Sequence, residues 1–376
     1  MLFRDIIGNE SAKKELSRIS SSGKIPHSQL ISGPVGSGVL PMAIAYGRGI
    51  LCGPQVKNAD ACNIKFSALK HPDLHFVFPV ANTVEIKSRA ISSHFLPSWR
   101  EFVNSNPYGG LFDWYTRLGI ENKQGKIGKD EAEDLIKKLS LKSYEGGWKC
   151  VIVWMPERMN ASATNKLLKL IEEPPKNTVF LFASESPHLL MDTLLSRCQR
   201  IDLKKISVQE IEKALLEKGF SVELSKRAAL ASSGDYNKAL SSANGSENEI
   251  LFEAWFQSWV RSAFKVKQNK EAVLELVDWS KKISKSGRET QKSFIGYSLE
   301  IFRQALLTNY GIGQITTHTP STDFNFKSFS KYVSGANIED VFIELEKAYL
   351  QIQSNGNANM VFSDLSLKLT RLIHKT

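Results

Sequence analysis

Strands and helices alternate along the first half of this chain, and the alternation limits the folds that it can adopt. Residues 150–155 are an unbroken apolar run, typical of a strand buried on both faces of a parallel sheet, and residues 178–183 are expected to form another buried strand. Between them, residues 160–172 have the apolar spacing of a helix and are followed by two prolines. Because strand–helix–strand units cross over in the right-handed sense, the sequence predicts a doubly wound α/β sheet up to about residue 203.

A glycine-rich segment, residues 33–38, lies between an expected strand at 28–32 and an expected helix at 42–50. It has the spacing of a phosphate-binding P-loop, in which backbone amides cradle phosphates and a lysine and a hydroxyl residue follow the last glycine. Its glycines are Gly33, Gly36 and Gly38. Val39 and Leu40 stand where the lysine and the hydroxyl residue are needed. These losses favour a tight strand-to-helix turn over nucleotide binding.

The carboxylates of a P-loop site are also missing. A second strand of such a site should end in Asp-Glu, which hold magnesium and polarise the attacking water. The strand at 150–155 instead ends in Trp154-Met155, and Glu157 follows Pro156. Glu157 could act as a displaced carboxylate, but a single glutamate after a strand is usually solvated, and we expect a surface residue.

Charge and cysteine content suggest the environment of the chain. Its 49 basic and 39 acidic residues give a net charge of +10, which favours a polyanionic partner or only improves solubility. Four unevenly spaced cysteines in 376 residues do not suggest a disulfide framework and fit a reducing compartment. No segment resembles a signal peptide or a membrane span, so we expect a cytoplasmic protein.

A further strand is expected to begin at residues 71–73, and no strand is expected from residue 208 onward. Residues 80–125 contain scattered aromatic residues without a sustained period, and we interpret them as an insertion or a partly ordered connection. Two short amphipathic helices fit 208–242. Residues 248–376 are predicted to be all-helical, with a loop over 316–330.

Several motifs together resemble the delta-prime subunits of the bacterial DNA polymerase III clamp loader, which belong to the AAA+ family. They are F-R-D-I-I-G from Phe3, the glycine loop, N-K-L-L-K-L-I-E-E-P-P from Asn165, and S-R-C-Q from Ser196. The resemblance implies an AAA+ (RecA-like) P-loop α/β domain with a degenerate loop over 1–205. It further implies a small helical lid over 206–245 and an all-helical collar over 248–376 that serves in oligomerisation.

The resemblance also implies a function. Members join a ring with the gamma or tau ATPase subunits and the delta subunit, and the ring places a sliding clamp on primed DNA. The Ser196-Arg197-Cys198 motif would supply Arg197 in trans as an arginine finger to ATP bound by a partner subunit; without the resemblance, an Arg paired with an acid would be the simpler interpretation. Asn237 stands where the lid of the family usually has a nucleotide-sensing arginine. We therefore expect no nucleotide cofactor on this chain, no intrinsic ATPase activity and no membrane partner.

The family's zinc site is incomplete. Cys52 and Cys62 match the first two of its four cysteines, but the last two positions are Lys65 and Ala68. His71 and His75 lie nearby and could substitute, yet two thiolates alone do not close a tetrahedral site. We expect no zinc.

Two other functions stay open. The chain could be an active, gamma-like AAA+ ATPase subunit with an atypical P-loop, which measured ATP binding would reveal. It could also contact DNA directly through its basic surface, but no helix carries a clear basic stripe, which allows only an accessory role.

Overall fold

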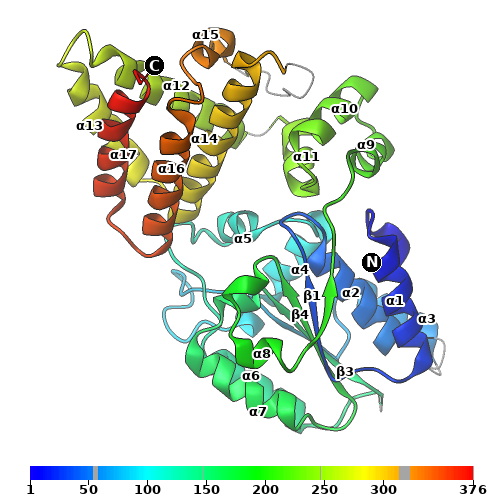
Figure 1. Cartoon of the computed structure of the whole chain (residues 1–376). Coiled ribbons are helices and arrows are strands. Elements are labelled where there is room, and N and C mark those ends of the chain that lie inside the picture. Colours follow the sequence, from blue (N-terminus) through cyan, green and yellow to red (C-terminus); the bar gives the residue numbers. More distant parts are fainter. Residues whose placement is uncertain (54–57, 146, 246, 313–321, 376) are drawn as a thin grey trace. The chain divides into compact units, whose positions relative to one another are not determined.

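The computed structural model describes residues 1–53, 58–145, 147–245, 247–312 and 322–375. The chain forms two compact units (Figure 1). The first comprises Met1–Ile120 and Gln124–Leu240, and the second comprises Glu121–Lys123 and Ser241–Thr376. The predicted lid helices fall mostly within the first unit; the predicted boundaries at 205, 245 and 248 stay predictions.

The first unit is built on a five-stranded parallel sheet with the order β2-β3-β4-β1-β5. The strands β1, β3 and β4 are buried along their whole length, as the apolar runs at 150–155 and 179–183 predicted for β3 and β4. The strands are β1 (Ser28–Ser32), β2 (Leu74–Val77), β3 (Lys149–Trp154), β4 (Thr178–Ser184) and β5 (Gln199–Asp202). The parallel α/β fold expected from the sequence is confirmed.

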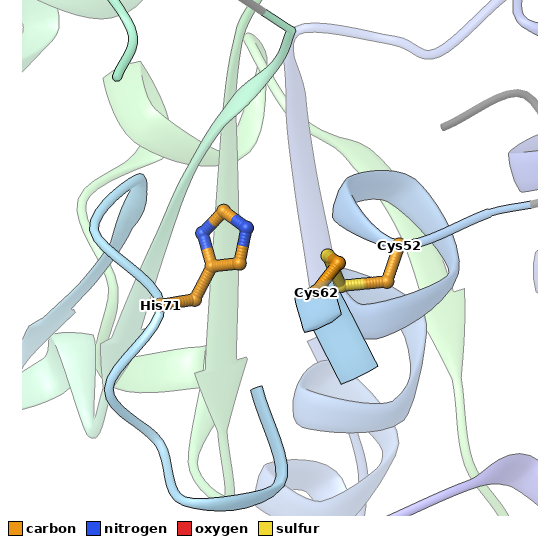
Figure 2. Close-up of side chains that lie close together, drawn as sticks. All are labelled: Cys52, Cys62 and His71. Atoms are coloured by element: carbon orange, nitrogen blue, oxygen red, sulfur yellow. A yellow bond between two sulfur atoms is a disulfide. The ribbon is translucent and has the colours of Figure 1, made fainter. Parts of the chain in front are cut away.

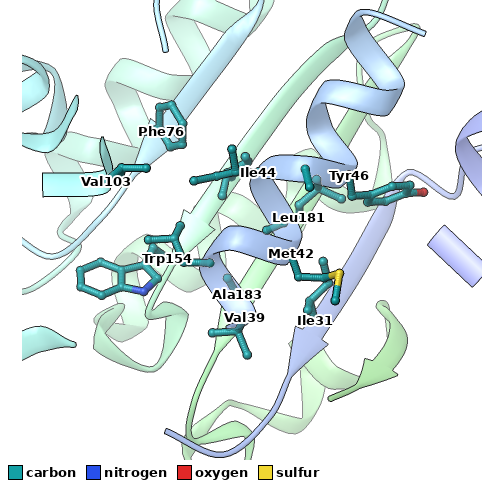
Figure 3. Packing of buried hydrophobic residues seen from close by; sticks show 14 of the residues in the cluster. Ile31, Val39, Met42, Ile44, Tyr46, Phe76, Val103, Trp154, Leu181 and Ala183 are labelled. Carbon is teal, nitrogen blue, oxygen red and sulfur yellow. The ribbon is translucent and has the colours of Figure 1, made fainter. Parts of the chain in front are cut away.

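Helices cover both faces of this sheet because alternate strand residues are apolar on each side. Leu181 and Ile31 belong to one core with helix α2, shown in Figure 3, whereas Phe180 and Leu30 belong to the opposite core with α6 and α7. The α-helices of this part are α1 (Glu10–Ser22), α2 (Val39–Leu51), α3 (Ala59–Ser67), α4 (Leu96–Ser105), α5 (Leu111–Leu118), α6 (Lys129–Ser140), α7 (Ala161–Glu172) and α8 (Asp192–Leu195).

Residues 80–125 are not a partly ordered connection, and that interpretation is wrong. They form a short 3₁₀ helix, α4 and α5, and the side chains of Trp99 and Trp114 are fully buried. The Trp99 ring stacks on Phe78 with centroids 4.1 Å apart, and Trp114 Nε1 donates to the Pro79 carbonyl at 2.9 Å. Helices of only 8 and 10 residues are too short to display a sustained helical period of apolar residues. The packing of the buried aromatic rings stabilises this segment instead.

Three helices, not the two predicted, occupy the segment that corresponds to the lid. They are α9 (Val208–Glu217), α10 (Val222–Ala231) and α11 (Tyr236–Ala243). Ser207 and Ser221 cap the first two, each accepting a hydrogen bond from a backbone N–H three residues ahead.

The second unit is helical, as predicted. Its helices are α12 (Glu247–Lys265), α13 (Ala272–Ser284), α14 (Arg288–Asn309), α15 (Phe326–Ser330), α16 (Ile338–Gln353) and α17 (Ala358–Leu372). Trp259 stacks on Trp279 at 5.1 Å in its core and donates from Nε1 to Ser366 Oγ. The loop expected over 316–330 is wrong where α15 lies, and residues 316–321 fall outside the described residues. Among the helices that the structure describes, none has the length and apolar character needed to cross a bilayer.

Candidate functional site

The glycine loop joins β1 to α2 at the position that a P-loop occupies. Gly36 and Gly38 have φ values of +72° and +90°, which residues with a Cβ rarely adopt. Val39 and Leu40, in the lysine and hydroxyl positions, are each only 2% exposed and belong to the core (Figure 3 labels Val39). The first turn of α2 therefore presents apolar side chains to the core instead of phosphate and metal ligands.

Side chains from elsewhere in the first unit cover this loop. A Cβ placed on Gly36 would lie 1.9 Å from Asp235 Oδ1, and one on Gly38 would lie 2.8 Å from the Tyr108 ring. The backbone N–H of Gly36 faces the carboxyl group of Glu185 and favours its charged form. One of the amides that would cradle a phosphate thus faces a carboxyl group of the chain itself.

The groups around the loop are acidic. Burial, reinforced by the nearby charges of Asp235 and Glu157, raises the pKa of Glu185 to about 8. Burial also raises the pKa of Glu157 and of Asp235. Phosphate groups brought to this loop would meet carboxyl groups instead of the lysine of a working P-loop.

Glu157 is not the solvated surface residue that we expected. It is partly buried, and its Oε2 accepts a hydrogen bond from Ser184 Oγ at 2.8 Å. Trp154 and Met155, where the Asp-Glu pair would stand, are almost completely buried. The strand therefore ends in core residues, and the Glu157 carboxyl group binds the end of β4.

Asn237, in the sensor position, binds the segment between β2 and α6. Its Nδ2 donates to Asp113 Oδ2 at 2.8 Å, and its Oδ1 accepts from Asn106 Nδ2 at 2.7 Å. Tyr108, from the same segment, contacts Tyr236 edge-on at 4.9 Å and accepts the Ile7 N–H. No spacing in the sequence signals these contacts.

Arg197 lies on the turn between α8 and β5, where the motif was expected to present it. Its Nε donates to Glu172 Oε1 at 2.7 Å, and its Nη1 donates to the Thr193 carbonyl at 2.8 Å. The side chain is 37% exposed. Ser196 Oγ contacts the same carbonyl at 3.3 Å, and Cys198 Sγ lies 3.0 Å from Ser28 Oγ. The Arg–acid pair foreseen as the simpler interpretation is therefore present, on a partly exposed side chain.

Cys52 and Cys62 form a disulfide, although the sequence suggested no disulfide framework (Figure 2). Their sulfurs and His71 lie within 4.8 Å of one another, because α2 and α3 bring the two cysteines together beside the loop that precedes β2. His75 does not belong to this group, so the predicted two-Cys two-His alternative is not assembled in the described part of the chain.

The donors of this cluster are engaged by other groups. His71 Nδ1 accepts the Asp73 N–H at 3.2 Å, and its Nε2 lies 3.3 Å from Glu145 Oε2. Lys65, in a zinc-cysteine position, pairs with Glu145 at 2.6 Å. Two sulfurs bonded to each other and an imidazole with both nitrogens bound do not fit a zinc site. This geometry supports the prediction of no zinc, which stays a prediction.

The parallel sheet, the glycine loop between β1 and α2, and the helices that follow define a parallel α/β protein with a helical C-terminal region. Residues 8–207 match the family model described as DNA polymerase III, delta subunit. The chain belongs to this family of clamp-loader proteins.

Several known proteins are similar to this chain. The chain is 22% identical over 393 residues to DNA polymerase III subunit tau of Bacillus subtilis (100% of this chain, 62% of the relative). It is 26% identical over 211 residues to subunit delta' of the same organism (55% and 50%), and 42% identical over 88 residues to delta' of Yersinia pestis (23% and 25%). The chain thus spans between half and two thirds of the length of the first two relatives. A gamma subunit-related protein of Thermotoga maritima superposes with a TM-score of 0.43 at 15% identity, over 96% of this chain and 99% of that one.

Proposed function

We propose that this chain is a delta-prime-type subunit of the DNA polymerase III clamp loader that does not hydrolyse ATP itself. The main support for this proposal is that the glycine loop has apolar residues and carboxyl groups where a P-loop has its phosphate and metal ligands. Val39 and Leu40 are core residues, and the Gly36 N–H faces the carboxyl group of Glu185. A site without a lysine, without a hydroxyl metal ligand and with carboxyl groups around its loop is poorly suited to hold a triphosphate.

In this role the chain acts on a neighbour's nucleotide. Arg197 would reach ATP bound by a gamma or tau subunit, where a planar guanidinium can stabilise the charge of the transferring phosphoryl group. The further partners would be the delta subunit, the sliding clamp and, through the assembled ring, primed DNA. The basic net charge of +10 supports a polyanionic partner.

One observation favours a gamma-like ATPase as the second candidate. The alignment with subunit tau of Bacillus subtilis covers the whole chain, whereas that with delta' of the same organism covers 55%. ATP titration by calorimetry separates the two candidates. We expect no saturable binding at micromolar ATP by the isolated chain; saturable micromolar binding would refute the delta-prime-type assignment and support the gamma-like one.

A reconstituted ring tests the role of Arg197. Arg197→Ala should leave folding and ring assembly intact but lower DNA-stimulated ATP turnover and clamp loading, because arginine fingers are worth roughly 10³-fold or more at a single site. Full activity of an assembled ring that contains Arg197→Ala would show that Arg197 has only a structural role.

A further inference from the structure

Glu172 holds two nitrogens of the Arg197 side chain at once. Its Oε1 lies 2.7 Å from Nε and 2.6 Å from Nη2, while the Thr193 carbonyl accepts from Nη1 at 2.8 Å. A fourth contact, from Nη1 to Ser196 Oγ, is longer at 3.4 Å. The guanidinium is therefore fixed along one side by a carboxylate and at its far nitrogen by a carbonyl.

Both groups that hold the guanidinium come from ordered elements. Glu172 is the last residue of α7, whose buried face includes Leu167 and Ile171, and Asn160 caps the start of this helix by accepting the Ala163 N–H. Thr193 belongs to α8, which packs on α7. The contacts thus define a single position for the guanidinium relative to the sheet.

We propose that Glu172 is a positioning residue for Arg197, which orients the guanidinium for the nucleotide of a neighbouring subunit. This role presupposes the proposed function. A free arginine loses considerable rotamer freedom when it is fixed in one geometry, and a side chain that is already held loses less on meeting phosphate. With 37% of its side chain exposed, Arg197 stays accessible to a second chain. Its five N–H donors are not exhausted by the two short contacts to Glu172 and the one to Thr193.

The test measures ATP turnover of the reconstituted ring with variants of this chain. The turnover lost in Arg197→Ala is measured first and is called the Arg197-dependent turnover. Exposed ion pairs contribute up to about 1 kcal/mol, equivalent to about five-fold. Glu172→Ala should therefore retain about a fifth of the Arg197-dependent turnover, through a lower kcat with a KM for ATP within about two-fold of wild type. Glu172→Gln, which keeps an acceptor oxygen, should lose less.

The matched control is Glu173→Gln. Glu173 is exposed, neighbours Glu172 and forms no ion pair within the described part of the chain, so turnover should be unchanged. In an Arg197→Ala background, Glu172→Ala should cause no further loss, because a positioning residue acts only through the residue that it positions.

The outcomes separate the two proposals. If Arg197→Ala has no effect, the proposed function fails. If Arg197→Ala lowers turnover but Glu172→Ala leaves it unchanged or raises it, only the positioning role fails. A further loss in the double variant would assign Glu172 to folding or assembly and would equally overturn the positioning role.

Discussion

Replacement of Glu185 by glutamine tests whether a carboxyl group really occupies the glycine loop. The pKa of Glu185 is raised from 4.5 to about 8, so between these values the folded chain binds a proton that the unfolded chain has released. The contribution of the Glu185 carboxyl to the free energy of unfolding is therefore fully present below pH 4.5 and is lost as the pH rises through 8. Glutamine keeps an acceptor for the Gly36 N–H and has no charge to desolvate.

The size of the effect follows from the shift. At 1.36 kcal/mol per pKa unit, the full rise corresponds to roughly 5 kcal/mol. Because Glu185 is partly exposed, we discount this value for solvent screening and expect about 2 kcal/mol. Glu185→Gln should thus match wild type in its free energy of unfolding near pH 4.5 and exceed it by about 2 kcal/mol at pH 8.

Urea unfolding followed by circular dichroism between pH 4.5 and 8 measures this difference. Glu15→Gln, at an exposed position in α1, is the control and should leave the pH profile of stability unchanged. A Glu185→Gln chain that keeps the pH slope of wild type, or that is the less stable chain at pH 8, would show that the Glu185 carboxyl is not desolvated against the loop.

Three other experiments test the remaining features of the chain. Elemental analysis of the purified protein should find no stoichiometric zinc, and one zinc per chain would overturn this expectation. Thiol titration of the denatured chain without reductant should detect only Cys150 and Cys198. Trp99→Ala should lower the free energy of unfolding by about 3–5 kcal/mol, whereas exposed Tyr144→Ala should change it by less than about 0.5 kcal/mol. Equal effects would contradict a core role for residues 80–125. Arg197→Lys should restore little of the ring activity lost in Arg197→Ala, because a point charge does not reproduce the planar fork; full activity would argue against bidentate contact with phosphate.

The features that depend on local pattern could be predicted from the sequence alone. The apolar runs at 150–155 and 178–183 could form only buried strands, and the intervening helix made their parallel pairing the natural outcome. The absence of a lysine and a hydroxyl residue after Gly38 was also visible directly, since P-loop chemistry requires fixed positions. Arg197 was singled out through the resemblance of its Ser-Arg-Cys motif to the clamp-loader family, and its role stays a prediction.

The residues that contact the glycine loop and Arg197, in contrast, depend on the tertiary structure. Gly36 faces Glu185 and is covered by Asp235, about 150 and 200 residues further along the chain, and no periodicity relates such distant residues. The short aromatic helices α4 and α5 gave no sustained period, and their order comes from rings packed against the sheet. Glu172 reaches Arg197 because α7 and α8 pack together at the end of the sheet. Contacts of this kind depend on how the elements pack, and the side-chain pattern of a single element does not contain that information.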